Sequence, residues 1–225
     1  MSASHLLIVA HPDDETIFFG GTMLSLKNRG WKVIVVTDGN ADGMGATRQN
    51  QLRSACKELG AKQVEQWDFP DVYEKRLNTD ALMERLAKEK MPKVVFTHGI
   101  IGEYGHPHHQ DVSWTVHKTF MKKVPVWSVA YNSFATKSIQ LSRKIYEKKS
   151  KVFSQIYHSE TVRFARVLPV HNHEGFHRTD WEEIDHLYSF FTDQIDDLDE
   201  SKLKNYRWFV PYLLEQKKVS QKRRF

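Results

Sequence analysis

Short apolar runs alternate with longer segments of mixed polarity along the first part of the chain. The apolar runs are rich in β-branched residues and show no strict alternation, which predicts strands buried on both faces. The predicted strands cover residues 5–10, 32–37, 64–69 (a weaker run), 93–97 and 126–131. Helical periodicity covers 17–29, 46–59 and 79–90, with Gly30 and Gly60 as stop signals and Thr79 as the expected cap of the third helix.

Strands that alternate with helices of this length are typical of βαβ units, in which helices connect parallel strands. We therefore predict an α/β fold, a Rossmann-like three-layer sandwich with a mostly parallel sheet. From about residue 136 the chain becomes more helical and aromatic, without a clear linker. We expect a single domain over residues 1–225, with a core at about 1–135 and a C-terminal extension at about 136–225.

The composition is ordinary for a soluble globular protein, with 40% hydrophobic and 27% charged residues. No apolar stretch is long enough to span a membrane, and the apolar run near the N-terminus lacks the cationic segment of a signal peptide. Cys56 is the only cysteine, which excludes an intrachain disulfide and a cysteine-based zinc cluster. These features predict a cytoplasmic protein, and they say nothing about its oligomeric state.

The formal net charge of +5 has a local source at the C-terminal end. The basic residues of this tail are Lys217, Lys218, Lys222, Arg223 and Arg224. A nucleic-acid site would interleave basic and aromatic residues along a groove, and the rest of the chain is nearly balanced in charge. We expect no nucleic-acid partner, and we interpret the tail as a solvated end or as a point of peripheral membrane contact.

The most informative polar segment follows the first predicted strand. There Ala10-His11-Pro12-Asp13-Asp14-Glu15 places an imidazole beside two adjacent carboxylates. In open α/β sheets, ligands bind outside the carboxyl ends of the strands. Taken singly, the acidic residues could be the first turn of a helix, and the histidine could be a hydrogen-bonded core residue. Taken together, they favour a metal ion with a carboxylate beside it.

A second segment, Gly102-Glu103-Tyr104-Gly105-His106-Pro107-His108-His109, follows the strand predicted at 93–97. Because parallel strands end at the same edge of a sheet, we expect this loop and the first one to converge. Two imidazoles and one carboxylate with open positions are typical of a catalytic zinc site. Asp13 and Asp14 point apart in an extended loop, so one can bind metal while the other acts as a general base.

The two motifs resemble those of the zinc-dependent N-acetylglucosamine de-N-acetylases. This is the PIG-L or LmbE-like family, which includes the deacetylases of mycothiol and bacillithiol biosynthesis. Weaker matches are Thr37-Asp38-Gly39, Arg48 with Ala55 and Leu59-Gly60, Phe69-Pro70-Asp71, Ser159-Glu160 and Glu174-Gly175-Phe176. The resemblance covers roughly residues 5–115, and it implies hydrolysis of the acetamide of a small N-acetylated amino-sugar conjugate.

The resemblance also implies a role for individual residues. The implied ligands of Zn²⁺, or of another divalent metal, are His11, Asp14 and His109. Asp13 is the implied base that activates the attacking water. The positions that stabilise the oxyanion or protonate the leaving amine are Tyr104 and His106. The positions that contact the sugar or its substituent are Arg48 and Asp71. Amide hydrolysis needs each of these functions.

Two residues depart from the family pattern. His108 stands where the family commonly has an aspartate, whose carboxylate would orient His106. Support for His106 must then come from elsewhere, and His108 could compete with His109 as a metal ligand. Gln51 stands where the family often has a glutamate on the Arg48 helix, which bears on substrate contacts.

Other interpretations stay open at this point. One is a catalytically weakened metal- and sugar-binding module of the same fold, which His108 and Gln51 would favour. Another is a nucleotide-binding Rossmann protein, although no G-x-G-x-x-G follows the first strand. A second histidine cluster, His171 with His173 and His177, lacks the order of a zinc motif. We interpret this cluster as a loop or the wall of a substrate cleft.

Overall fold

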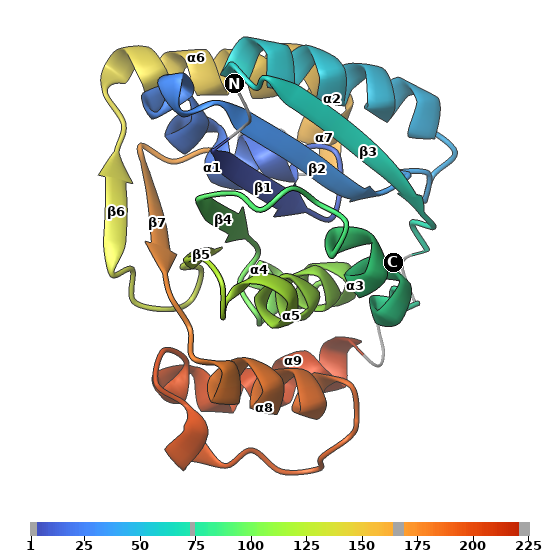
Figure 1. Cartoon of the computed structure of the whole chain (residues 1–225), viewed down its shortest axis with the longest axis vertical. Helices are drawn as coiled ribbons and strands as arrows, with labels where there is room; N and C mark the ends of the chain where they lie inside the picture. Colours follow the sequence, from blue (N-terminus) through green and yellow to red (C-terminus); the bar gives the residue numbers. More distant parts are fainter. Residues whose placement is uncertain (1–3, 73–74, 164–168, 221–225) are drawn as a thin grey trace. The chain divides into compact units, whose positions relative to one another are not determined.

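A computed structural model describes residues 4–72, 75–163 and 169–220 of the chain (Figure 1). It confirms the α/β fold, with seven strands of a mixed, mostly parallel sheet in this part of the chain. The strands are β1 (His5–Val9), β2 (Trp31–Thr37), β3 (Gln63–Phe69), β4 (Val94–Thr97), β5 (Val126–Val129), β6 (Lys137–Gln140) and β7 (His173–His177). The α-helices are α1 (Asp14–Ser25), α2 (Gly45–Leu59), α3 (Thr79–Leu86), α4 (Gly102–Gly105), α5 (Pro107–Phe120), α6 (Arg143–Ile156), α7 (His158–Arg163), α8 (Trp181–Phe191) and α9 (Val210–Ser220).

The chain divides into two compact units. The first contains Met1–Asp71 and Lys137–Gly175, and the second contains Val72–Thr136 and Phe176–Phe225. Each unit therefore includes a segment from either side of residue 136. A single domain with a core and an extension stays a prediction.

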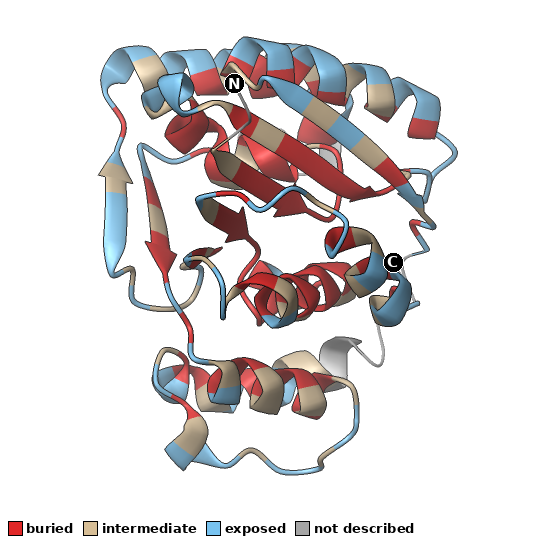
Figure 2. Ribbon diagram, in the orientation of Figure 1, coloured by how far each residue is buried: buried red, intermediate tan, exposed pale blue. Residues whose placement is uncertain are grey.

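In the first unit, β1, β2 and β3 form a parallel set. Leu7 pairs with Val33 across β1 and β2, and Lys32 pairs with Gln63 across β2 and β3. Residues of β1 and β2 are almost entirely buried, as the unalternating apolar runs predicted, whereas β3 is mostly exposed or half-buried (Figure 2). Helices α1, α2 and α6 pack on one another. The carboxyl end of β1 delivers the chain directly into the His11 loop.

A buried ion pair forms hydrogen bonds with backbone groups in the middle of α1. Lys149 of α6 and Glu174 of β7 lie 2.6 Å apart, and their side chains are almost completely buried. The Lys149 ammonium also donates to the carbonyl oxygen of Ile17, at 2.6 Å, while Glu174 accepts from the backbone amides of Gly21 and Thr22, at 2.7 Å each. A regular helix would join the Ile17 carbonyl to the Gly21 amide. The pair therefore anchors two later segments of the first unit to α1.

In the second unit, α5 is the central helix. It packs against β4 and β5 and against α3 and α8. Strands β4 and β5 are parallel, with Val95 opposite Val126, and β7 pairs antiparallel with β5 through Phe176 and His177. An apolar cluster on α8 and the segments that follow it includes Leu187, Phe190, Leu203, Tyr206 and Leu213. The unit thus holds α5, and the histidines at its start, between strands and helices.

The pattern of the chain missed two strands and misplaced the ends of two helices: α1 covers Asp14–Ser25, where 17–29 was expected, and α3 differs as well. β6 and β7 are short and polar, so neither has the apolar run of a buried strand. Asn78, and not Thr79, caps α3, because its side chain accepts the amide of Ala81 at 3.0 Å. α3 also ends at Leu86, four residues before the expected end. The side-chain cap of Asn78 decided the first of these two boundaries.

Two residues of the second histidine cluster lie on a strand, and His171 lies in the loop before it. His173 and His177 are the first and last residues of β7, so their spacing of four residues separates them along an extended chain. His171 and His173 are exposed, whereas His177 is buried and bonds to Ser133 and Tyr206. These three histidines therefore do not form a metal site of the helical type.

None of the helices in the described ranges is both long and apolar enough to cross a bilayer. Of the basic tail, Lys222, Arg223 and Arg224 lie outside the described residues. Lys217 contacts Asp193 at 3.0 Å.

Candidate functional site

The first group of candidate residues lies on the loop between β1 and α1. Thr37, at the end of β2, donates both its amide and its hydroxyl to the carbonyl oxygen of Ala10, at 3.0 and 2.9 Å. Gly39 approaches Pro12 so closely that a Cβ atom there would lie 2.9 Å from the proline ring, and its φ is +64°. The Thr37-Asp38-Gly39 segment therefore supports the start of the His11 loop.

His11 and Asp14, both predicted metal ligands, are buried next to each other. The backbone amide of His11 donates to Oδ2 of Asp14 at 2.8 Å, and its Nδ1 lies 3.4 Å from the same oxygen. Its Nε2 lies 3.5 Å from Oδ1 of Asp71. Burial by itself would lower the pKa of His11, but hydrogen bonds to Asp14 and Asp71 raise it to about 10. These carboxylates thus favour positive charge at this position, which either a proton on the ring or a cation bound by the neutral ring would supply.

Asp13, the predicted base, has an unusual backbone. Its φ is 118° and its ψ is −32°, a conformation that L-residues rarely adopt. Its side chain is half-buried, unlike that of Asp14. Burial, followed by the negative charges of Asp14 and Glu160, raises the pKa of Asp13 well above its usual range. A carboxylate held in this way is suited to take up a proton.

Glu15 occupies the first turn of α1, as the pattern indicated, but it does more than face the helix dipole. It is fully buried. One carboxylate oxygen accepts the amide of Asp13 at 3.0 Å, and the other accepts the hydroxyls of Thr16 and Tyr157, at 2.5 and 3.0 Å. Burial raises the pKa of Glu15 to about 7. The motif spacing could not reveal Tyr157, which comes from the end of α6.

The two predicted substrate-contact residues also belong to the first unit. Arg48 is buried on α2, and its guanidinium donates to both carboxylate oxygens of Glu160, at 3.1 Å each, and to Asp42 at 3.2 Å. Asp71 lies beside His11, and its amide donates to Asp38 at 3.0 Å. The first unit therefore brings Asp71 close to a predicted ligand and pairs Arg48 with an acidic residue.

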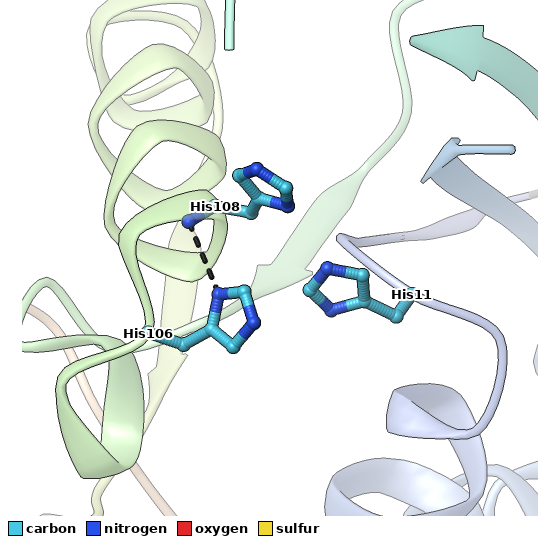
Figure 3. Close-up of side chains that lie close together, drawn as sticks. All are labelled: His11, His106 and His108. Atoms are coloured by element: carbon cyan, nitrogen blue, oxygen red, sulfur yellow. Dashed lines mark hydrogen bonds between the residues drawn. The ribbon is translucent and has the colours of Figure 1, made fainter. Parts of the chain in front are cut away.

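The second group of candidate residues lies at the start of α5. His106 is the N-cap of this helix, and its Nδ1 accepts the backbone amide of His108 at 3.2 Å. Figure 3 shows this bond, together with the side chain of His11 on the loop after β1. Pro107, His108 and His109 form the first helical turn, so the expected loop ends at His106. Pro at the first helical position explains this boundary, because its missing N–H costs nothing there.

His108 is held away from the aspartate-like role of the family motif. Its Nε2–H donates to the carbonyl oxygen of Lys75 at 2.8 Å. The next residue, Arg76, donates to the carbonyl oxygen of Pro107 and to Asp111 of α5, at 3.0 Å each. The 75–77 segment therefore fixes the start of α5. An aspartate would accept a proton from Nδ1 of His106, whereas here Nδ1 accepts the backbone amide of residue 108, which orients the ring in the other tautomer.

His109, the third predicted ligand, bonds to a carboxylate that the sequence analysis did not single out. Its Nδ1–H donates to Oε2 of Glu103 at 2.6 Å, and Nδ1–H of His98 donates to the same oxygen at 3.1 Å. The two imidazole rings stack with centroids 3.8 Å apart. Burial would raise the pKa of Glu103, but the two histidines, His98 first, lower it to about 2.

Glu103 is well placed to orient His109. Its backbone has a φ of 53° and a ψ of −69°, which interrupts the short helix α4. Glu103, His98 and His109 could themselves hold a metal, since their ligand atoms lie within 4.8 Å of one another. Both Nδ1 atoms already bond to the carboxylate, however, and metal-binding histidines usually donate their second nitrogen to such a group. The glutamate six residues before His109 was the sequence signal for this contact.

Tyr104 differs from the histidines around it in being half-exposed. Its ring makes edge-to-face contacts with the rings of His106 and His109, with centroids 5.9 and 5.5 Å apart. Tyr104 is therefore the exposed member of a ring cluster whose two histidines are buried. The second unit therefore brings together three of the predicted site residues.

Several relatives of the chain are named for deacetylation of amino sugars. It is 33% identical over 148 residues to 1D-myo-inositol 2-acetamido-2-deoxy-alpha-D-glucopyranoside deacetylase 1 of Saccharopolyspora erythraea, which covers 46% of this chain and 49% of that protein. It is 32% identical over 114 residues to the N-acetylglucosaminyl-phosphatidylinositol de-N-acetylase of Bos taurus, covering 46% and 45%. The chain thus spans about half the length of these relatives.

Solved structures share the fold at low sequence identity. A conserved protein from Thermus thermophilus matches with a TM-score of 0.63 and 18% identity, over 79% of this chain and 94% of that chain. The N,N'-diacetylchitobiose deacetylase from Pyrococcus horikoshii matches with a TM-score of 0.58 and 18% identity, over 86% and 90%. The sequence profile described as PIG-L, GlcNAc-PI de-N-acetylase, matches residues 6–120. With both motifs inside that match, the chain belongs to the PIG-L family of de-N-acetylases.

Proposed function

We propose that the protein is a metal-dependent hydrolase that removes the acetyl group from an N-acetylated amino sugar. Water and the amide give acetate and a free amine. The observation that carries the proposal is the first loop, where buried His11 and Asp14 adjoin half-buried Asp13 on a strained backbone. Strain of this kind concentrates at functional sites. Family membership supports the reaction class, and the substrate's other half stays unassigned.

The proposed metal ligands are His11, Asp14 and His109. The donor set fits a cation such as Zn²⁺, since it offers imidazole and carboxylate groups and no thiolate. The carboxylates around His11 and the bond from His109 to Glu103 are features that metal-binding histidines need. When bound, the cation would polarise the acetyl carbonyl and lower the pKa of the attacking water.

The remaining steps fall to side chains of the chain itself. Asp13 would accept a proton from the attacking water and return one to the leaving nitrogen. His106 accepts the amide of His108 at Nδ1, so its neutral ring carries the proton on Nε2. This makes His106 a donor toward the developing oxyanion, with Tyr104 as the second polar group.

The proposed substrate contacts are Arg48 and Asp71. Asp71 lies beside His11, where a sugar hydroxyl could replace part of that contact. Arg48 is already bonded to Glu160, so its contribution would be to hold that carboxylate for sugar hydroxyls. The cytoplasmic location stays a prediction based on the single cysteine.

The proposal is tested by acetate release and metal content. Wild type, loaded separately with Zn²⁺ and other divalent metals, is incubated with the inositol-linked N-acetylglucosamine and with N,N'-diacetylchitobiose. Asp13→Asn should keep the bound metal and lose acetate release, since the isosteric amide cannot accept the proton. Glu147→Gln, on the exposed side of α6, is the matched control and should match wild type. Wild-type turnover in Asp13→Asn would refute the assignment of the base.

A protein that binds the metal and a sugar but releases no acetate from any N-acetylated sugar would favour a catalytically weakened binding module instead. Nucleotide-dependent thermal stabilisation in place of metal-dependent stabilisation would favour a nucleotide-binding protein.

A further inference from the structure

The backbone of Asp13 is held by a buried side chain that the reaction itself does not need. Asp13 has a φ of 118°, which costs free energy in any residue other than glycine. Such a conformation persists only where the surrounding structure imposes it. Its amide donates to Oε2 of Glu15 at 3.0 Å, so the contact sits at the strained residue itself.

Glu15 is itself fixed from two sides. Its Oε1 accepts the hydroxyl of Thr16 at 2.5 Å and that of Tyr157 at 3.0 Å. Tyr157 is completely buried and comes from the C-terminal cap of α6, far away in the sequence. Both oxygens of the carboxylate are therefore committed to donors, and none of these bonds belongs to the repeating pattern of α1.

We propose that Glu15, braced by Tyr157, is a positioning residue that holds the backbone of Asp13 so that its carboxylate faces the reaction. This inference rests on the proposed function, in which Asp13 is the base. This contact needs a side chain at residue 15 that is long enough to place an acceptor oxygen at the Asp13 amide. The side chain does not need to be negatively charged.

Four variants separate geometry from charge. Glu15→Gln keeps the length of the side chain and an acceptor oxygen, but removes the charge. Glu15→Asp keeps the charge and shortens the reach by one methylene. Glu15→Ala removes both. Tyr157→Phe removes one brace and keeps the ring. Thr115→Val is the matched control, because it deletes a buried hydroxyl that bonds only within α5.

Activity is measured as acetate released from the inositol-linked N-acetylglucosamine and from N,N'-diacetylchitobiose. We expect Glu15→Ala and Glu15→Asp to lower kcat roughly tenfold to a hundredfold, the effect of a misplaced catalytic group, with KM and metal content unchanged. Tyr157→Phe should lower kcat about two- to tenfold, in line with the loss of one hydrogen bond. Glu15→Gln should keep most of the activity, and Thr115→Val all of it.

A second readout does not depend on turnover. Hydrogen–deuterium exchange, followed in peptides that contain Asp13, should rise in Glu15→Ala and Glu15→Asp and stay near wild type in Glu15→Gln. If Glu15→Ala does not fold, Glu15→Asp and Tyr157→Phe carry both measurements.

Three results would overturn the inference. The first is full activity in Glu15→Asp together with loss of activity in Glu15→Gln, because this result would show that the negative charge of residue 15 matters and its length does not. The second is a fall in kcat that follows a fall in metal content or melting temperature, which would make Glu15 merely structural. The third is unchanged exchange at Asp13 in Glu15→Ala and Glu15→Asp. If wild type releases no acetate from either probe, the proposed function fails, and exchange alone then decides whether Glu15 holds Asp13.

Discussion

The imidazole of His109 donates Nδ1–H to Oε2 of Glu103 over 2.6 Å, and both side chains are completely buried. This bond fixes the tautomer of the ring and directs its Nε2 away from the carboxylate. Glu103 has no counterpart in the motif that identifies His109. The contact therefore shows how this chain supports a residue that we propose as a metal ligand.

Replacing Glu103 by Gln should weaken metal binding. The amide keeps the shape of the side chain but cannot accept both histidine protons as a charged group does. We expect a loss of roughly 10- to 100-fold in Zn²⁺ affinity, the usual effect of removing the outer partner of a metal-bound histidine. Competition with a chromogenic chelator measures it. Glu84→Gln, on α3, serves as a control, and an unchanged affinity in Glu103→Gln would contradict the supporting role.

Replacing His108 by Ala should leave catalysis nearly intact. The contact from residue 108 to His106 passes through the backbone amide, which alanine retains. The bond from Nε2 to the Lys75 carbonyl would be lost, at a cost of about 1 kcal/mol in the free energy of unfolding. Urea unfolding and acetate release check the two parts. A loss of bound metal in this variant would instead identify His108 as a ligand.

The contribution of two buried histidines to stability should fall as the pH drops from 6.5 to 4. His117 and His177 are buried, and desolvation lowers the pKa of each from 6.5 to about 4. Over this interval the unfolded chain binds more protons, so the contribution is complete above pH 6.5 and is lost on acidification. Each histidine contributes roughly 3 kcal/mol at neutral pH.

Urea titrations at several pH values test this linkage. His117→Gln should have a shallower pH dependence of the free energy of unfolding than wild type, because one of the two groups no longer titrates. His158→Gln, which changes an exposed histidine, should keep the wild-type slope. Equal slopes in His117→Gln and wild type would show that His117 is not held neutral.

Removing one partner of the Lys149–Glu174 pair should destabilise the fold strongly. Lys149→Met leaves the Glu174 carboxylate buried without its counter-charge, which costs about 3–5 kcal/mol. Adding Glu174→Gln should recover part of that loss, since the amide is neutral and still accepts a backbone N–H.

Lys148→Met is the matched control on the same helix. Its exposed pair with Glu58 should be worth less than about 1 kcal/mol. Thermal or urea unfolding compares the three variants. Equal losses of unfolding free energy for Lys148→Met and Lys149→Met would show that burial does not make the Lys149–Glu174 pair more important for stability than the exposed Lys148–Glu58 pair.

Local pattern determined the greater part of the fold. The predicted strands at 5–10, 32–37 and 64–69 agree with β1, β2 and β3 to within one residue at each end. For β1 and β2 the reason is that buried parallel strands carry continuous apolar runs. β6 and β7 escaped prediction because short polar strands owe their pairing to neighbours distant in the sequence.

The sequence by itself also indicated the kind of chemistry that the site offers. The two motifs predicted imidazole and carboxylate ligands, and the resemblance to the de-N-acetylases implied the separate roles of His11, Asp13, Asp14 and His109. Only the tertiary structure decided which groups support them. Tyr157, at the end of α6, donates a hydrogen bond to Glu15. His108, which stands where the family commonly has an aspartate, bonds to the carbonyl oxygen of Lys75. Such contacts join residues far apart in the chain, and no local periodicity encodes them. They depend on how buried polar groups find partners once the backbone has folded.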